Sequence, residues 1–148
     1  MGETELRELM ELLFFGYRDF TAGPDKILAD YGFGRAHHRV VYFVGRDPGL
    51  SVSELLKILN ITKQSLARVL GQLIEEGFIQ QTADEKDRRR RLLTLTNKGQ
   101  ELDQALRARQ GEALNRAILA AGPEALLGFR SVLRHIINEE DRLRFDKA

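Results

Sequence analysis

The sequence predicts a mainly α-helical fold that carries a small β-hairpin wing. Three observations within residues 50–99 support this prediction. Two short stretches of helical periodicity follow each other closely, the second of them ends at a glycine, and two short apolar runs then flank a highly charged segment. Because two tandem helices followed by a hairpin are the order of elements in a winged helix-turn-helix, this is the fold class that we expect.

The first of the two tandem helices is expected to begin after Ser51. Ser51 and Glu54 have the spacing of a capping box, in which each residue satisfies a free backbone amide at the helix start. Apolar residues then recur at helical intervals: Val52, Leu55, Leu56 and Leu59. The helix therefore presents one apolar stripe, and Asn60-Ile61 provides a tight connection to the next helix.

The second helix combines an apolar face with a face rich in hydrogen-bond donors. Thr62 is its candidate N-cap, and Gly77 is its candidate C′ glycine. The apolar face consists of Leu66, Val69, Leu70, Leu73 and Ile74. The opposite face carries Lys63, Gln64, Ser65, Arg68 and Gln72. Long donor side chains of this kind can enter the major groove and reach phosphates and base edges, so we interpret this helix as a recognition helix.

The hairpin is expected to have strands at Phe78–Thr82 and Leu92–Leu95, joined by a charged loop. The loop contains four consecutive arginines at 88–91. A run of charges is usually no more than a solvated hairpin tip. Here it follows a donor-rich helix, and a tip arginine fits the narrow, electronegative minor groove of A/T-rich DNA. We therefore expect the wing to contact DNA.

These residues resemble the MarR family of transcription regulators. The run Asp87-Arg88-Arg89, followed by Leu95-Thr96 and then Gly99, is similar to the wing signature of that family. The run ITKQSLARVLGQLIEEGFI is similar to its recognition helix and first wing strand, and the resemblance covers residues 32–99.

The resemblance implies a role for particular wing residues. Asp87 would anchor the wing and Arg89 would enter the minor groove, while Arg90 and Arg91 occupy positions that are often apolar or small in the family. Which arginine reaches furthest stays open. The residues that we expect to contact DNA are Lys63, Gln64, Ser65, Arg68, Asp87, Arg88, Arg89 and Arg90.

The N-terminal region, residues 1–31, is expected to be helical and apolar on two faces. One face consists of Leu6, Leu9, Met10, Leu13, Tyr17 and Phe20, and the other of Leu12, Phe14 and Phe15. Such a helix needs two partners, and we expect one to be its own core and the other a second subunit. Gly23-Pro24 is expected to interrupt the helix, because proline removes a donor and restricts the residue before it. A buried helix is expected over 35–46.

His37 and His38 suggest a metal site, but adjacent helical positions point about 100° apart and cannot share a ligand face. The third histidine, His135, adds no spacing signature, so we expect packing or capping roles and no metal. A small-molecule pocket is the other possibility, and the resemblance favours it because the family binds ligands between its dimerisation helices and its DNA-binding lobe. Aromatic walls with a few donors would come from Phe14, Phe15, Arg18, His38 and Tyr42, unless these residues simply pack.

The C-terminal region, residues 100–148, is expected to contain two amphipathic helices. Thr96 is the candidate N-cap of the first, and Gly122-Pro123 separates it from the second. Their apolar faces cannot all be buried on a compact lobe formed by residues 32–99. A homodimer built from the N- and C-terminal helices would bury them, and the resemblance implies the same assembly.

Composition excludes several classes of protein. The 148 residues carry a net charge of only +1 and no cysteine, which excludes disulfides, thiolate metal sites and thiol-based sensing within the chain. No apolar run approaches the ~20 residues of a membrane span, and no signal peptide is recognisable, so we expect a cytoplasmic protein. Enzyme motifs are also absent from the sequence, so we expect neither catalysis nor a cofactor.

The sequence thus predicts a dimeric, sequence-specific DNA-binding transcription regulator that reads a pseudo-palindromic operator. We expect it to act as a repressor that a small aromatic or anionic effector releases. The alternative is a winged-helix protein-interaction module whose wing-loop arginines bind an acidic protein partner. The donor-rich recognition face favours DNA, because protein contact faces are usually richer in aromatic residues and methionine.

Overall fold

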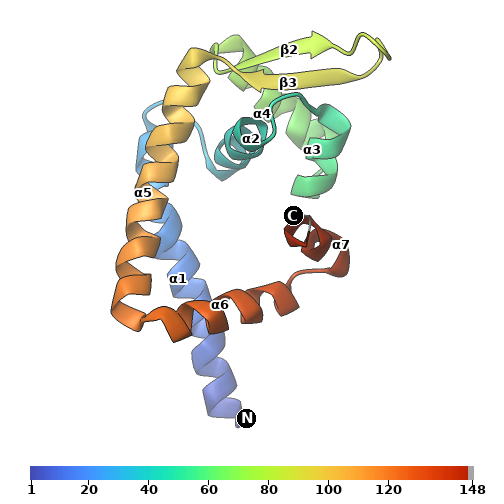
Figure 1. Ribbon diagram of the computed structural model, residues 1–148. Helices are drawn as coiled ribbons and strands as arrows, with labels where there is room; N and C mark the ends of the chain where they lie inside the picture. Colours follow the sequence, from blue (N-terminus) through green and yellow to red (C-terminus); the bar gives the residue numbers. More distant parts are fainter. Residues whose placement is uncertain (147–148) are drawn as a thin grey trace. The chain divides into compact units, whose positions relative to one another are not determined.

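The computed structural model describes residues 1–146, and the chain divides into two compact units, Met1–Gln110 and Gly111–Ala148. Elements of the first unit are α1 (Glu3–Ala29), α2 (Arg35–Arg46), β1 (Leu50–Ser51), α3 (Val52–Leu59), α4 (Lys63–Glu75), β2 (Ile79–Ala83), β3 (Arg91–Leu95) and the first part of α5 (Asn97–Ala121) (Figure 1). The second unit holds the rest of α5, then α6 (Pro123–Ile136), α7 (Glu139–Arg142) and a 3₁₀ turn, Leu143–Phe145. Within the described part of the chain, no helix has the length and apolar character needed to cross a membrane.

The core of the first unit lies between α2, α4 and a three-stranded antiparallel sheet of order β1-β3-β2. Helix α2 contributes three fully buried valines, Val40, Val41 and Val44, and the middle strand contributes the fully buried Leu93. The predicted apolar face of α4 packs against them, except for Ile74, which lies at the edge of the face and is exposed. The winged helix-turn-helix predicted from the sequence is therefore confirmed, with α3 and α4 as its tandem helices and β2–β3 as its wing.

The predicted caps form as expected. The Ser51 hydroxyl accepts a hydrogen bond from the backbone N–H of Glu54 (3.1 Å), and Thr62 accepts one from Ser65 (3.1 Å). Gly77, with φ of +84°, ends the recognition helix α4 in the left-handed region that glycine tolerates best. These contacts explain why the two short helices begin and end where the sequence indicates.

Strand β1 was not expected from the sequence. It consists of Leu50 and Ser51, which pair with Leu93 and Leu92 of β3, and the N–H of Gly49 adds a hydrogen bond to the carbonyl of Leu93 (2.8 Å). Two residues are too few to show the alternation by which a strand is recognised. The pairing ties the start of α3 to the wing.

The prediction that Gly23-Pro24 interrupts the first helix is wrong, because α1 continues to Ala29. The lost backbone hydrogen bond is offset by packing: Pro24 and Leu28 are fully buried, and Gly23 lies against Arg109 of α5. One turn earlier, the Thr21 hydroxyl donates to the carbonyl of Tyr17 (3.0 Å). Tertiary contacts therefore outweigh the helix-breaking tendency of proline.

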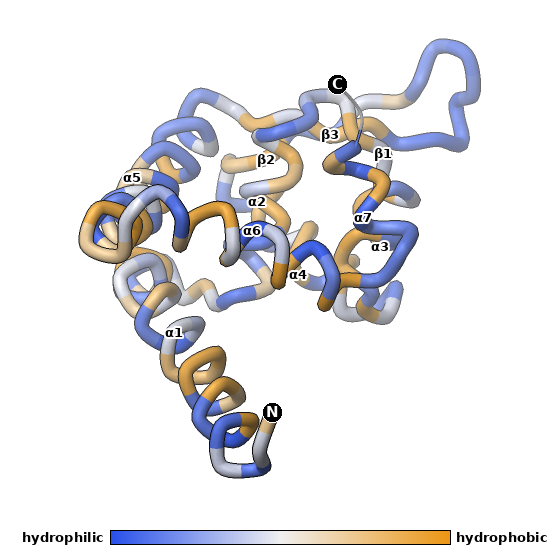
Figure 2. The backbone as a smooth tube through the Cα atoms, turned by 60° about the horizontal axis from the view of Figure 1, so that its bottom comes forward, coloured by the Kyte–Doolittle hydropathy of each residue, from blue (hydrophilic) through white to orange (hydrophobic). Residues whose placement is uncertain are grey.

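The first half of α1 makes no use of the core of its own unit. Residues 3–19 are all exposed, so the expectation that one of their two apolar faces packs on the chain's own core is wrong. Figure 2 shows apolar segments along this part of α1. The half-exposed side chains include Leu9, Leu13 and Tyr17, with exposed fractions near one half.

The second unit also leaves apolar residues uncovered. Helix α6 begins at Pro123, as expected, after Gly122 with φ of +98°, and none of its residues is buried. Helix α7 was not predicted, although Asn138 caps it by accepting from the N–H of Asp141 (2.7 Å). The guanidinium of Arg142 then donates to the carbonyl of Arg134 (2.8 Å), which ties α7 back to the end of α6.

The start of α5 lies unusually close to the end of α4. Thr96 caps α5 by accepting from the N–H of Gly99 (3.1 Å), and its own N–H donates to the carbonyl of Phe78 (3.1 Å). A Cβ at Gly99 would lie 2.1 Å from that carbonyl oxygen, so no larger residue fits without movement of the backbone.

We therefore expect Gly99→Ala to lower the free energy of unfolding by ~1–3 kcal/mol, the usual cost of overpacking. Gly111→Ala is the matched control, because Gly111 lies in the same helix and a Cβ added there would meet nothing within 4 Å. There alanine should raise stability by up to ~1 kcal/mol through helix propensity. Urea denaturation of both variants measures the difference in their free energies of unfolding. Equal effects of the two substitutions would contradict the close approach of Gly99 to the carbonyl of Phe78.

Candidate nucleic-acid interface

The exposed face of α4 carries the donors predicted from the sequence. Lys63, Gln64 and Arg68 are exposed and Ser65 is partly buried, whereas the opposite face of the helix is buried in the core. Three of these four residues belong to the first turn, directly after the Thr62 cap. The N-terminal end of the helix therefore presents amine, amide, hydroxyl and guanidinium groups to the outside.

Gln72, further along the same helix, is held by α2. Nδ1 of His37 accepts a hydrogen bond from the N–H of Gly34 (3.1 Å), so the proton of the neutral ring lies on Nε2. Nε2 lies 2.6 Å from the side-chain oxygen of Gln72 and donates to it. The ring also stacks on Phe33, with centroids 4.5 Å apart. His37 thus has the capping role expected for it and joins α2 to the recognition helix.

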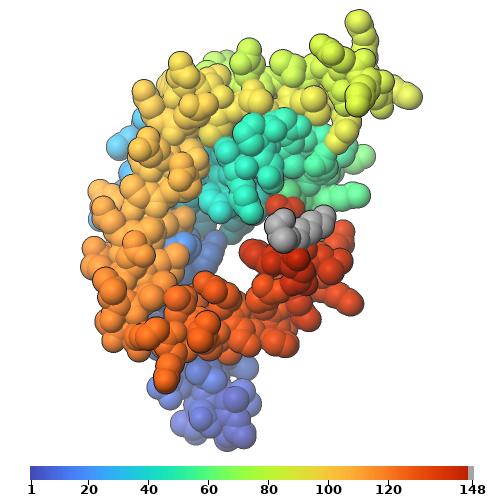
Figure 3. Space-filling view, viewed as in Figure 1, coloured from blue at the N-terminus to red at the C-terminus, as the bar shows by residue number. Residues whose placement is uncertain are grey.

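The wing loop projects from the body of its unit (Figure 3). Asp87 organises its tip: its carboxylate accepts from the N–H of Arg89 (3.1 Å), and its carbonyl accepts from the N–H of Arg90 (2.9 Å). The carbonyl of Arg90 in turn accepts from the N–H of Asp84 (2.9 Å), which closes the loop. The side chain of Arg89 is 96% exposed, with Nε 3.7 Å from the Asp87 carboxylate. This exposure leaves the guanidinium accessible to a partner.

Arg90 differs from its neighbours because its guanidinium is engaged within the protein. It forms an ion pair with the carboxylate of Glu54 at the start of α3, and its Nη1 lies 3.7 Å from the carboxylate of Asp84. A hydrogen bond from the Ser51 hydroxyl, together with Arg90, lowers the pKa of the Glu54 carboxyl. Although the sequence placed Arg90 among the DNA contacts, its geometry favours a role inside the wing.

The five residues expected to line a ligand pocket fall into two groups. On α1, the rings of Phe14 and Phe15 meet edge to face at 5.2 Å, and the guanidinium of Arg18 lies 4.7 Å from the Phe15 ring. All three are exposed. On α2, His38 and Tyr42 are one turn apart, His38 buried and Tyr42 partly buried.

His38 has the environment of a packed core histidine. Burial lowers the pKa of its imidazole, and the nearby carboxylates of Asp25 and Asp103 oppose this effect only in part. The ring is therefore neutral near pH 7. Across residues 1–146, no group of three or more histidine and carboxylate side chains is arranged to hold a metal ion.

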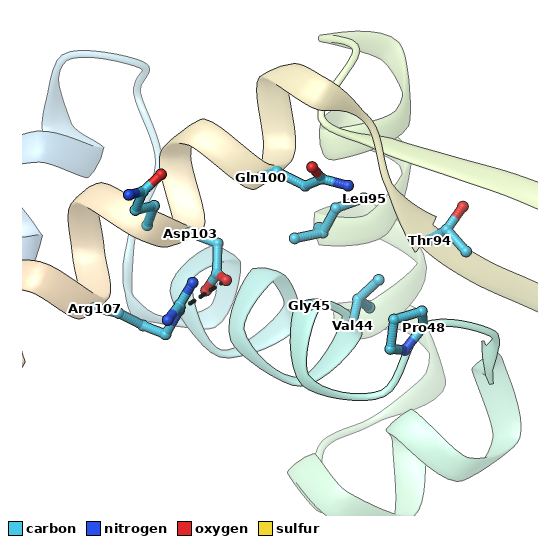
Figure 4. Close-up of a pocket in the computed structure, with 9 residues that line it drawn as sticks. Val44, Gly45, Pro48, Thr94, Leu95, Gln100, Asp103 and Arg107 are labelled. Atoms are coloured by element: carbon cyan, nitrogen blue, oxygen red, sulfur yellow. Dashed lines mark hydrogen bonds and ion pairs between the residues drawn. The ribbon is translucent and has the colours of Figure 1, made fainter.

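A cavity of about 450 Å³ opens where α2, β3 and α5 meet (Figure 4). Asp103, with only 10% of its side chain exposed, pairs there with Arg107 (3.0 Å). The lining residues are Val44, Gly45, Pro48, Thr94, Leu95, Gln100, Asp103, Gln104 and Arg107. None of the five predicted ligand residues is among them. Sequence reasoning missed this cavity because its residues come from three separate elements and form no motif.

Comparison with known proteins identifies relatives across nearly the whole chain. The sequence model of the MarR family matches residues 31–90. The HTH-type transcriptional regulator PetP of Rhodobacter capsulatus is 43% identical over 145 residues, which cover 98% of this chain and 87% of that protein.

Solved structures share the fold. A crystal structure of MarR has a TM-score of 0.66 and 26% identity, over 95% of this chain and 94% of that one. A mutant MarR from E. coli, complexed with operator DNA, has a TM-score of 0.70 and 18% identity, over 90% of this chain and 96% of that one.

Proposed function

Because the chain belongs to the MarR family of transcription regulators, we propose that it controls transcription as a homodimer that binds a pseudo-palindromic operator. The homologues are regulators and not enzymes, and the alternative of a winged-helix interaction module is not favoured. One observation carries the proposal: α4 and the wing loop present donors and an unburied arginine on the two elements that a winged helix uses to read DNA. We propose residues 32–99 as the DNA-binding lobe and residues 1–31 and 100–148 as dimerisation regions.

The first two turns of α4 would read the major groove. Lys63, Gln64, Ser65 and Arg68 offer bidentate and single hydrogen bonds to base edges and phosphates, and no acidic residue occurs in the first turn. Because the rest of the helix is fixed in the core by four buried side chains, these donors are presented on a rigid support. Such support favours affinity, since little backbone freedom is lost on binding.

The wing would read the minor groove through Arg89. Its side chain is almost fully exposed. The Asp87 carboxylate accepts a hydrogen bond from the backbone N–H of Arg89 and so fixes the backbone at that residue. Arg88 and Arg91 are also exposed and would reach phosphates. Since the net charge of the chain is only +1, attraction to DNA has to come from this local concentration of arginines.

The dimer would cover the apolar residues that each unit leaves exposed. Leu9, Met10 and Leu13 of α1 and Phe129 and Ile136 of α6 have exposed fractions of one half or more. Exposed apolar surface on this scale marks an interaction site in a soluble protein. A two-fold axis would space the two recognition helices by about one DNA turn, ~34 Å. We place this dimer in the cytoplasm, where it would act as a repressor.

The first prediction from this proposed function concerns the wing. Arg89→Ala should weaken binding about tenfold on all operator variants alike, because a minor-groove arginine contributes chiefly electrostatic affinity. Arg46→Ala removes the same charge from an exposed position at the end of α2, outside the proposed dimerisation regions and DNA contacts, and is the control. Gel shifts at two salt concentrations measure the operator affinity of both variants. Gln64→Ala should instead relax the sequence preference at one base pair of the operator. Equal affinity of Arg89→Ala and the wild type would remove the wing from the mechanism.

The second prediction concerns the dimer. Light scattering should give twice the chain mass at micromolar concentration, and Leu13→Glu should shift the mass to a monomer while far-ultraviolet circular dichroism stays helical. The reason is that a buried, unpaired charge is costly at an apolar interface. Glu11→Lys, a charge change two residues away, is the control. A monomeric wild-type protein would contradict the proposal.

The third prediction concerns an effector, which we propose to be a small aromatic anion that lowers DNA affinity. A coupling of ~1–3 kcal/mol between the two sites would change operator affinity about 5- to 150-fold. Calorimetric titration of benzoate-like and phenolic compounds, with and without operator, measures this coupling. Arg18→Gln should abolish binding if the ligand lies at Phe14, Phe15, Arg18, His38 and Tyr42, whereas Gln100→Leu should weaken it if the ligand lies in the cavity. No binding by any compound would leave a regulator without this effector class.

A further inference from the structure

We propose that the ion pair between Glu54 and Arg90, here called the wing strap, positions the wing and so sets the reach of Arg89 into the minor groove. Glu54 is then a positioning residue for DNA recognition, although it is an acid and itself repels phosphate. The inference rests on the DNA-binding function proposed above. It goes further by assigning a role to a residue of α3 that lies outside both reading elements.

The strap joins residues 36 positions apart in the sequence. On the wing side, Arg90 takes part in the loop through its backbone as well as its side chain: its N–H donates to Asp87 (2.9 Å) and its carbonyl accepts from Asp84 (2.9 Å). Arg89 stands directly before it. A shift of the Arg90 guanidinium would therefore be transmitted to the short turn that carries Arg89.

On the other side, Glu54 is fixed to the core. The hydroxyl of Ser51 donates to the Glu54 carboxylate (2.9 Å), and Ser51 is buried with 1% exposure. Ser51 belongs to β1, where it pairs with Leu92 of β3, the strand that leads out of the wing. The wing strap thus connects the base of the wing, where β1 pairs with β3, to the wing loop. The loop is therefore held both by the β2–β3 pairing and by the wing strap.

Charge also separates Arg90 from its neighbours. Its guanidinium lies between the carboxylates of Glu54 and Asp84, so its positive charge is already compensated within the protein. The side chain of Asp84 is only 17% exposed, and its other contact is with the N–H of Lys86 (3.0 Å). Arg90 is consequently a poor phosphate ligand, whereas the side chain of Arg89 is 96% exposed and its Nε lies 3.7 Å from the carboxylate of Asp87.

A positioning role for Glu54 and a purely electrostatic role predict opposite changes in DNA affinity when the charge of Glu54 is removed. If Glu54 acts on DNA only through its charge, neutralising it reduces repulsion of phosphate and strengthens binding. If Glu54 holds the wing, the same change frees the loop. Ordering the loop again on DNA then costs conformational entropy, and binding weakens.

The test uses Glu54→Gln in the full-length protein. Glutamine keeps a side-chain oxygen for the Ser51 hydroxyl and leaves the cap of α3 in place, but it removes the charge that pairs with Arg90. We expect operator binding to weaken about threefold to fivefold, the range of an exposed ion pair. Glu85→Gln is the matched control, because it neutralises an exposed acid of the same wing loop. It should leave affinity unchanged or raise it, and thermal unfolding confirms that both variants fold.

A double-mutant cycle with Arg89→Ala tests whether Glu54 acts through Arg89. In that background Glu54→Gln should no longer weaken binding, since the contact it positions is already gone. Glu54→Gln that binds as tightly as Glu85→Gln, or that weakens binding equally with and without Arg89, would overturn the strap. Arg89→Ala without any effect would instead overturn the minor-groove contact of the proposed function, and the strap with it.

Discussion

The burial of Phe78 is the interaction on which the arrangement of the first unit depends. Its ring meets the rings of Tyr31 and Phe33 edge to face, at centroid distances of 5.3 and 5.4 Å. Its carbonyl accepts from the N–H of Thr96, and the absence of a side chain at Gly99 lets α5 approach that carbonyl. One residue thus joins the end of the recognition helix, the first wing strand, the turn after α1 and the start of α5.

This junction constrains how α5 can move relative to α4 and the wing. The amine of Lys98 lies 4.4 Å from the Phe78 ring centre and donates to the carbonyl of Glu76 (2.8 Å), so the last turn of α4 is bonded to the first turn of α5. A close-packed junction of this kind has little room for small continuous adjustments. In the proposed dimer, reorientation of α5 would therefore carry α4 and the wing with it, and a ligand that biases α5 would alter the spacing of the two recognition helices. The contacts give the proposed effector a physical route to DNA affinity.

Local signals in the sequence predicted most of this fold, because caps, glycines and helical periods act within a few residues. Ser51, Thr62 and Gly77 define the tandem helices without help from distant parts of the chain. The predictions that were wrong or missing concern segments whose structure depends on residues distant in the sequence. Pro24 stays helical because it is buried, and β1 forms because Leu50 pairs with Leu93 of β3. The cavity beside Asp103 depends on three elements at once. The exposed donors of α4 followed from periodicity, but their contact with DNA stays a prediction.

The wing shows why four consecutive arginines cannot be assigned equal roles from sequence. Each carries the same charge, yet the partners differ: Arg90 faces two carboxylates, those of Glu54 and Asp84, while Arg89 keeps 96% of its side chain exposed and has its Nε 3.7 Å from the carboxylate of Asp87. In a chain of net charge +1, a guanidinium paired internally contributes little to the attraction of DNA but can fix geometry. In the proposed function, Arg89 would then supply affinity for DNA, and its neighbour Arg90 would supply the orientation of the wing. The division between them is set by Glu54, a residue of α3 that the charge pattern of the wing does not reveal.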